Sequence, residues 1–516
     1  MNKQIIRYTL GNILMILAGL MILPLIVSLI YQESWVNIAS FLGTALVTFA
    51  IGFFLSRTKL HRRNFYATEG FTIVSLSWIA ISFFSAIPFV VSQQIPSFVD
   101  AFFEMSSGFT TTGASILNDV EALSHSMLFW RSFTHFVGGM GVLVFALAIL
   151  PKAESASVHI MKAEMTGPTF GKLVSKLSST ARILYVIYFV FMMITLGLLW
   201  LAGVPFFDSM LLAFGTAGTG GFGVLNGSIA PYDSFTVEMI LSIGMIVFSI
   251  NFNLFYLAFI GQAKRALKSE ELRWFLAIIA GSVFLIALNL ISTSYGVTSA
   301  FRDSFFTVAS IISTTGYSTA LFDHWPLFSQ LMLILLMFVG GMAGSTAGGL
   351  KVSRIMLLIK AAWAEIKRTI RPNRVVAIEY EGRRIDAKLV NTVLSYFVVY
   401  VLIFVVAVLV VSLETPNLLS SFSAVAATFN NIGPGLGIVG PSQNFAHFSP
   451  LVKIVLSFIM IMGRLEIFPM IILFAPNTWL KRFLLMDSWL SCRFSTNSSD
   501  KITLALLEAL VRKKTE

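Results

Sequence analysis

The sequence predicts an all-α polytopic membrane protein. We expect four pseudo-symmetric helix, pore-loop, helix repeats around one central pore, preceded by two additional N-terminal transmembrane helices. Three observations predict this class: the apolar composition, the alternation of charge between connections, and a glycine motif that recurs four times. Of the 516 residues, 56% are hydrophobic and 12% are charged, and the mean hydropathy is +0.84. So much apolar surface cannot be buried in one water-soluble core.

Ten apolar runs have the length needed to cross a membrane, about 20 residues each. They lie at 8–30, 35–55, 70–91, 127–150, 181–203, 236–260, 272–294, 327–359, 389–412 and 450–475. Glycines interrupt the eighth run. The first run is too long for the apolar part of a signal peptide and lacks a small-residue cleavage site, so we expect it to stay as a membrane helix.

The net charge of +11 is unevenly distributed. Lys and Arg concentrate in alternate connections, at 57–63, 152–182, 264–273, 351–388 and 481–482. The intervening connections contain a single basic residue, Arg302. The positive-inside rule places the basic connections and both termini in the cytoplasm. This alternation favours membrane lipid, and excludes nucleic acid, as the partner of the positive charge.

Each intervening connection contains a short apolar segment, too short to cross the membrane and long enough to re-enter it. We expect these pore helices at 100–109, 208–217, 303–312 and 420–429. Each segment starts with a residue that can cap a helix N-terminus, and these residues are Asp100, Asp208, Asp303 and Ser420.

A loop of small and hydroxyl residues follows each pore helix and has a central glycine. The central glycines Gly113, Gly220, Gly316 and Gly433 recur about every 100 residues, which indicates one unit copied four times. Irregular backbone at membrane depth occurs only where protein buries it or where it lines a wet cavity. Four such loops around an axis can present carbonyl oxygens that replace the hydration shell of a cation. The predicted filter residues are Thr111, Thr112, Gly113, Thr219, Gly220, Thr314, Thr315, Gly316, Asn431, Ile432 and Gly433.

The recurring motifs divide the chain into six units. The expected units are the two additional N-terminal helices at 1–65, pore repeats at 66–150, 151–265, 266–375 and 376–475, and a cytoplasmic tail at 476–516. The tail carries apolar residues at helical spacing over 500–514. Docking of a partner and packing on the membrane surface both remain open for that segment.

The third repeat contains five glycines within ten residues: Gly340, Gly341, Gly344, Gly348 and Gly349. Three of them are spaced by four, which suits close helix packing. Glycine also costs a helix about 1 kcal/mol relative to Ala at each position. We therefore expect an intramembrane gating loop below the filter, with Lys351 at its cytoplasmic end.

Arg464 is a charged residue in the middle of an apolar run, where a charge is costly and usually faces a cavity or a partner. It can act as a positive barrier beneath the filter. The alternative is a structural role, paired with Glu466 or with backbone carbonyls. Arg131 and His135, one helical turn apart, are expected to be structural.

Residues for enzyme chemistry are missing from the sequence. Cys492 is the one cysteine, and the histidines show no metal-ligand spacing. There is no nucleophile triad, Walker motif or dinucleotide fingerprint. We therefore expect no enzyme and no organic cofactor, and any nucleotide control would come from a partner chain.

These motifs resemble the Trk, Ktr and HKT superfamily of potassium transporters, and most closely its bacterial TrkH/TrkG branch. The resemblance covers roughly 60–475 and rests on five segments, Thr110–Ser115, Gly218–Phe222, Ser313–Ser318, Gly340–Lys351 and Ala427–Gly437. It implies potassium ion as the transported species, a homodimer in the bacterial inner membrane, and a cytosolic nucleotide-binding subunit of the TrkA type. Gly113 favours potassium, because a serine at this position accompanies sodium permeation in some plant relatives.

Two modes of transport follow from these predictions. The first is channel-like potassium uptake, driven by the membrane potential and gated by the cytosolic subunit. The second is symport with protons or sodium, which needs an intramembrane carboxylate, and Glu466 is the main deep candidate. A third possibility is a scaffold subunit that carries no ion.

Overall fold

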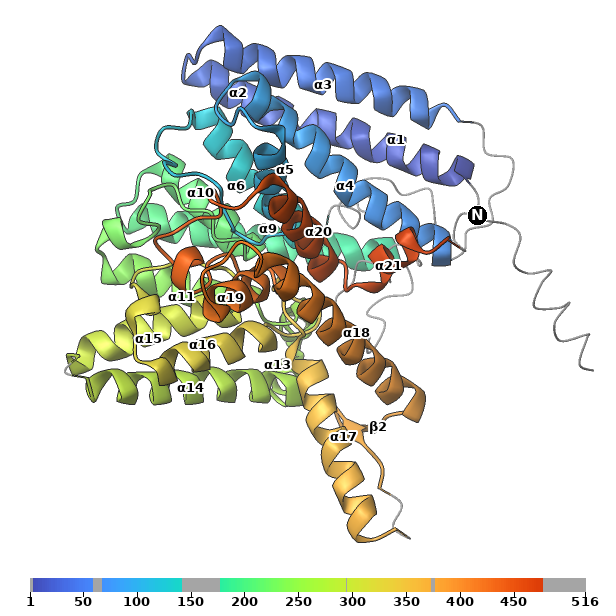
Figure 1. Ribbon diagram of the computed structural model, residues 1–516, viewed down its shortest axis with the longest axis vertical. Helices are drawn as coiled ribbons and strands as arrows, with labels where there is room; N and C mark the ends of the chain where they lie inside the picture. The colour runs from blue at the N-terminus through green and yellow to red at the C-terminus, as the bar shows by residue number, and fades with distance from the viewer. Residues whose placement is uncertain (1–2, 59–66, 142–176, 294, 373–375, 477–516) are drawn as a thin grey trace, which may run out of the picture.

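The computed structural model describes residues 3–58, 67–141, 177–293, 295–372 and 376–476 (Figure 1). It is a helical bundle with one small hairpin, in which β1 (Glu379–Tyr380) pairs antiparallel with β2 (Arg383–Arg384). The predicted tail helix at 500–514 lies outside the described residues. The all-α membrane fold predicted from the sequence is confirmed.

The N-terminal helices form a separate pair at one side of the bundle (Figure 1). They are α1 (Lys3–Leu20), continued by α2 (Ile22–Ile30), and α3 (Trp35–Ser56). Glycines set how closely α1 and α3 approach. A Cβ atom added to Gly11 would lie 2.6 Å from the carbonyl oxygen of Gly52, and one added to Gly52 would lie 2.8 Å from that of Gly11.

The rest of the bundle follows the order helix, short helix, helix four times. The first set is α4 (Ala67–Val91), α5 (Phe98–Phe109) and α6 (His125–Gly139). The second is α9 (Leu177–Leu201), α10 (Phe206–Gly218) and α11 (Phe235–Phe248), continued by α12 (Phe252–Leu257), η2 (Ala258–Gln262) and α13 (Ala263–Leu267). The third is α14 (Glu270–Ile291), α15 (Val297–Ile312), α16 (Leu327–Val339) and α17 (Val352–Ile370). The fourth is α18 (Ala387–Val411), α19 (Leu418–Phe429), α20 (Pro450–Arg464) and α21 (Phe468–Phe474).

Short 3-10 turns, η1 (Ala230–Tyr232), η3 (Phe322–His324) and η4 (Gly437–Val439), lie in the connections that follow α10, α15 and α19. At the end of the bundle opposite the N-terminal pair, α17 and the hairpin extend away from the other helices (Figure 1).

Six helical segments among the described residues are long and apolar enough to span a membrane on their own. They include the N-terminal pair and the first helix of each set, namely α4, α9, α14 and α18. The helix that follows the pore helix in each set, which we call the second long helix, is shorter than the first. These second long helices are α6, α11, α16 and α20, and they end at Gly139, Phe248, Val339 and Arg464.

Two of the runs expected to be continuous are broken, so the prediction is wrong there. In the run at 236–260, the axis turns by 91° between α11 and the segment Phe252–Leu267. In the run at 450–475, the chain leaves α20 through Glu466 and Ile467, which have φ of +58° and +66°. The break expected in the eighth run is present, between α16 and α17.

The pore helices are present as α5, α10, α15 and α19, but they begin earlier than expected. Ser97 precedes α5 and its hydroxyl accepts from the Asp100 amide, while Asn417 precedes α19 and accepts from the Ser420 amide at 2.8 Å. The predicted caps therefore lie inside the helices: Asp100, Asp208 and Ser420 at the third position, and Asp303 further along. A carboxylate in the first turn still interacts favourably with the helix dipole.

The α1–α3 contact gives a prediction about stability. Gly11→Leu should lower the thermal unfolding temperature of the detergent-solubilised protein, because overpacking a tight contact costs about 1–3 kcal/mol. The matched control is Gly19→Leu on the same helix, where an added Cβ meets nothing within 4 Å. Equal unfolding temperatures for the two variants would show that the α1–α3 contact contributes no stability.

Candidate functional site: a ring of four glycine loops

The loops that follow the four pore helices have the same backbone conformation. Each begins with a non-glycine residue in the left-handed region, at φ of +54° to +58°, and these residues are Thr111, Thr219, Thr314 and Asn431. Two residues later comes a glycine at φ of +74° to +101°, and these glycines are Gly113, Gly221, Gly316 and Gly433. Residues with a Cβ atom rarely adopt the glycine conformation.

The residue between these two positions anchors each loop to its pore helix. Its amide donates to the carbonyl five residues earlier, at 2.8 to 2.9 Å, in the pairs Thr112 to Ser107, Gly220 to Gly215, Thr315 to Ser310 and Ile432 to Ala427. Gly220 therefore occupies the position of Thr112 rather than that of Gly113. The second central glycine is Gly221, and the register predicted for this repeat is wrong by one residue, because two adjacent glycines made the assignment ambiguous.

The four central glycines touch one another's loops in a closed cycle. A Cβ atom added to Gly113 would lie 2.1 Å from the carbonyl oxygen of Gly220. The same atom on Gly221 would lie 1.8 Å from the Thr315 oxygen, and on Gly316 it would lie 2.0 Å from the Ile432 oxygen. On Gly433 it would lie 2.7 Å from the Thr112 oxygen, which returns the cycle to the first loop. We call these four glycines and four carbonyls the carbonyl ring.

Side chains around the ring differ between the repeats. In the first and third loops, pairs of hydroxyls hydrogen-bond, Thr110 with Thr112 at 2.8 Å and Ser313 with Thr315 at 2.7 Å. The fourth loop has an amide instead. Asn431 donates to the Thr112 hydroxyl at 2.9 Å and to the Met460 carbonyl at 3.0 Å.

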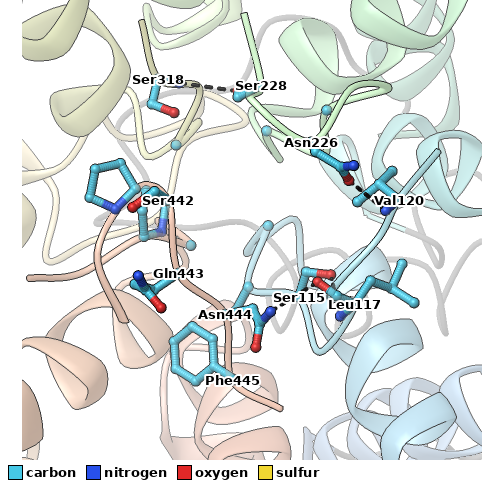
Figure 2. Close-up of a pocket in the computed structure, with 18 of the residues that line it drawn as sticks. Ser115, Leu117, Val120, Asn226, Ser228, Ser318, Ser442, Gln443, Asn444 and Phe445 are labelled. Carbon is cyan, nitrogen blue, oxygen red and sulfur yellow. Dashed lines mark hydrogen bonds between the residues drawn. The ribbon is translucent and has the colours of Figure 1, made fainter. Parts of the chain in front are cut away.

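A cavity of about 130 Å³ opens against one side of the carbonyl ring and is lined by all four central glycines. Hydroxyl and amide side chains form part of its wall, and Figure 2 shows them converging from all four repeats: Ser115, Asn226, Ser228, Ser318, Ser442, Gln443 and Asn444. Arg131 of α6 also lines the cavity. Hydrogen bonds join the repeats around the mouth, such as Val120 to Asn226 at 2.7 Å and Ser318 to Ser228 at 3.2 Å. These residues belong to the connections in which Arg302 is the one Lys or Arg.

On the opposite side of the ring, the glycine-rich segment at 340–351 packs against the third and fourth loops. The Gly348 amide donates to the Thr314 hydroxyl at 2.6 Å, and the Gly349 amide donates to the Asn430 carbonyl at 3.1 Å. A Cβ atom on Gly348 would lie 2.3 Å from that carbonyl oxygen. Gly340, Gly344 and Gly349 have φ of +68° to +76°, so the segment is an irregular loop and the alternative of a continuous packed helix is excluded.

The break in α11 supplies acceptors for this loop. Carbonyls at the end of a helix have no partner within it. Here the Met342 amide donates to the Ser249 carbonyl at 3.0 Å, and the Thr346 hydroxyl donates to the Phe248 carbonyl at 3.0 Å. The loop and the broken helix therefore satisfy each other's backbone groups at membrane depth.

A second contact holds both ends of the loop. Glu271, near the start of α14, is buried, and one of its carboxylate oxygens accepts from the Ala343 amide at 2.8 Å and the Ser353 amide at 3.2 Å. The other oxygen accepts from the Tyr380 hydroxyl of the hairpin at 3.0 Å. Burial and the nearby Glu271 charge raise the pKa of Tyr380, which keeps this hydroxyl protonated as a donor.

Arg464, at the end of α20, joins the loop to the first repeat. Its guanidinium donates to the Thr346 carbonyl at 2.6 Å, and to the carbonyls of Gly138 and Gly139 at 2.8 and 2.5 Å. The last two are terminal carbonyls of α6. Glu466 accepts from Arg354 at 2.5 Å. The contact with backbone carbonyls, which the sequence suggested as the structural alternative for Arg464, is thus present.

Comparison with known proteins agrees with this arrangement. A family model described as a cation transport protein, TrkH, matches residues 38–481. The chain belongs to the TrkH family. The Trk system potassium uptake protein TrkH of Salmonella typhimurium is 35% identical, over 93% of this chain and all of that protein. The TrkG protein of Escherichia coli K12 is 31% identical, over 93% of this chain and 99% of its own length.

The fold of a TrkH family member has also been solved. The crystal structure of the potassium transporter TrkH from Vibrio parahaemolyticus aligns with a TM-score of 0.84 at 33% identity. The match covers 93% of this chain and the whole of that one. The family resemblance predicted from the motifs is confirmed.

The structure brings the predicted site residues of this TrkH family member together in two layers. The eleven predicted filter residues lie in the four loops that form the carbonyl ring. The predicted gating residues lie beneath the ring: Gly340, Gly341, Gly344, Gly348, Gly349, Lys351 and Arg464. Lys351 is buried, and its ammonium donates to the Ala347 carbonyl.

Sequence reasoning missed Gly221 and Glu271. An acidic residue at the start of an apolar run was a visible signal for Glu271, but its partners lie more than 70 residues away.

The register of the second loop gives a prediction. Gly220→Ala should destabilise the protein, because the new Cβ atom would lie 1.5 Å from Nδ1 of His135, and the double variant with His135→Ala should recover much of the loss. Gly221→Ala should not be rescued in this way, since its obstacle is the Thr315 backbone. Thermal unfolding of the purified variants measures both effects, each about 1–3 kcal/mol. Equal rescue of Gly220→Ala and Gly221→Ala would contradict the assigned register.

Proposed function

We propose that this chain is a potassium uptake transporter in which ions cross the membrane through the carbonyl ring in a channel-like manner. The observation that carries the proposal is the closed cycle of four glycine-to-carbonyl contacts facing a polar cavity. Backbone carbonyls arranged around an axis can replace the water lost by a dehydrating cation.

The surroundings of the ring favour a cation. The ring follows directly from the C-terminal ends of α5, α10, α15 and α19, and helix C-termini carry partial negative charge. The filter would consist of the eleven predicted residues together with Gly221. The connections on the cavity side hold Arg302 as their one Lys or Arg. Arg131 also lines the cavity, and its charge is balanced by the ion pair with Glu104.

Potassium is the favoured cation for two reasons. The relatives that match over most of this chain are named as potassium uptake proteins. All four ring positions are glycine, and a Cβ atom at any of them would displace a neighbouring carbonyl oxygen.

The loop at 340–351 is the proposed gate. It contacts the underside of the third and fourth filter loops, and Arg464 ties its Thr346 carbonyl to the end of α6. A guanidinium at this point also opposes a cation leaving the filter. Opening requires the loop to leave the ring and Arg464 to leave Thr346.

Assembly follows the same proposal. The chain would act as a homodimer in the bacterial inner membrane, with both termini cytoplasmic, and would be regulated by a cytosolic nucleotide-binding subunit of the TrkA type. The alternation of basic connections supports the cytoplasmic termini. The Glu271 contact, which links the loop to the hairpin of a basic connection, supports regulation from the cytoplasmic side. The homodimer is proposed from the family resemblance.

The rival mode is symport coupled to protons or sodium. Its main candidate carboxylate, Glu466, already accepts from Arg354 at 2.5 Å. A carboxylate held in an ion pair is a weak acceptor for a coupling ion, which favours the channel-like mode.

Reconstituted vesicles with an imposed membrane potential, and no proton or sodium gradient, test the proposal. We expect sustained potassium uptake, and Gly316→Ser should reduce potassium over sodium discrimination because its Cβ would lie 2.0 Å from the Ile432 carbonyl oxygen. The control is Gly281→Ser, where an added Cβ meets nothing within 4 Å. Uptake that begins only after an ion gradient is added would establish symport, and unchanged discrimination in Gly316→Ser would contradict the filter.

Removing the Arg464 side chain tests the gate. Arg464→Ala should raise potassium flux, since it deletes both the contact to Thr346 and the positive charge beneath the filter. A rise of about tenfold corresponds to a loss of about 1.4 kcal/mol in the barrier. Arg368→Ala, which removes an exposed arginine on α17, is the control. A folded Arg464→Ala protein with wild-type flux would exclude the gating role.

A further inference from the structure

Beside the carbonyl ring, a buried ion pair joins the first pore helix to α6, and its arginine, Arg131, is one of the residues that line the cavity. Nε of Arg131 lies 2.6 Å from Oε1 of Glu104, and the two side chains are 3% and 0% exposed. A buried ion pair is often no more stabilising than well-packed apolar residues of the same volume, because both charges lose their hydration. Stability alone therefore does not explain why these two charges are buried here.

The carboxylate holds the segment that follows the ring glycine in the first repeat. We call the segment after each ring glycine a strand of the ring, although it belongs to no β-sheet. Oε1 of Glu104 accepts from the Ser115 hydroxyl at 3.0 Å, and Oε2 accepts from the Ile116 amide at 3.0 Å. These residues follow Gly113 by two and three positions. Glu104 thus fixes the first strand just beyond its ring glycine.

The guanidinium holds the corresponding strand of the second repeat. Arg131 donates to the Gly223 carbonyl at 3.1 Å, and its guanidinium carbon lies 3.5 Å from the centre of the Phe222 ring, within cation–π distance. These residues follow Gly221 by one and two positions. A single ion pair therefore connects two neighbouring strands of the ring.

The third and fourth strands are held differently. Ser310 of α15 donates to the Tyr317 carbonyl at 2.6 Å, and Ser423 of α19 bonds the backbone of Leu436 at 3.0 Å in both directions. In both cases a neutral hydroxyl ties the strand to the pore helix of its own repeat. The ionic contact across a repeat boundary thus distinguishes the first and second strands.

We propose that Glu104 and Arg131 are specificity-determining positioning residues, which fix the spacing of the Thr112 and Gly220 carbonyls so that the filter prefers potassium to sodium. This inference rests on the proposed function. With the pair weakened, the two strands can move relative to each other, and their carbonyls can close around the smaller sodium ion. The pair acts through the backbone of both strands.

Two conservative variants test this role. Glu104→Gln removes the charge and keeps the shape, while Arg131→Lys keeps the charge and loses the forked donor geometry that reaches Glu104 and Gly223 together. Glu238→Gln is the matched control, because Glu238 also pairs with an arginine, Arg302, at 2.6 and 2.8 Å, and links α11 to α15 away from the ring. The measurement is the potassium-to-sodium permeability ratio in vesicles under an imposed potential.

We expect Glu104→Gln and Arg131→Lys to lower this ratio about tenfold, equivalent to about 1.4 kcal/mol, and Glu238→Gln to leave it at the wild-type value. An unchanged ratio in the two filter variants, with a lowered unfolding temperature alone, would overturn the proposal and leave the pair a structural contact. If Glu104→Gln does not fold, the ratio for Arg131→Lys decides.

Potassium flux through the wild-type chain tests the proposed function separately from the role of Glu104 and Arg131. If the wild-type chain carries no potassium, the proposed function fails, and the role of the pair is then tested by ion binding, measured as a change in unfolding temperature. Potassium should raise the unfolding temperature of the purified wild type and of Glu238→Gln more than sodium does, since a bound ion stabilises the folded state. Loss of this difference in Glu104→Gln supports the proposal, and its persistence overturns it.

Discussion

The contact on which the rest of the structure depends is the one between a glycine of one loop and a carbonyl oxygen of the next. It occurs four times and closes on itself, and it leaves no room for a Cβ atom at any of the four glycines. Loops can meet so closely within a membrane only if their remaining backbone groups are satisfied. The re-entrant helices meet this need, because each loop donates an amide back to the last turn of its own helix.

The ends of α6 and α11 also have their backbone groups satisfied. Where α6 and α11 stop, their terminal carbonyls accept from Arg464 and from the loop at 340–351. The segment proposed as the gate is therefore also the hydrogen-bond complement of the break after α11, and Arg464 links it to the end of α6. Moving the loop would expose the carbonyls of Phe248 and Ser249, and water or passing cations are the partners available to replace it.

Much of this architecture could be predicted from the sequence, because the glycine loops repeat at a regular interval and charge alternates between the connections. The pore helices and the irregular segment after α16 followed from composition. The breaks after Phe248 and Arg464 did not, since hydropathy measures apolar content and is blind to a turn inside an apolar run. The partners of Glu104 and Glu271 were also hidden, because each pairing depends on how distant helices meet.

The single-chain origin of the ring has a consequence for how such a protein varies. In an assembly of four identical subunits, every substitution in a filter loop enters the ring four times. Here it enters once, so Asn431 and Ile432 in the fourth loop differ from Thr111 and Thr112 in the first while the backbone geometry stays the same. One quadrant can therefore acquire its own chemistry, such as the amide of Asn431, by a single change that leaves the other three loops as they are.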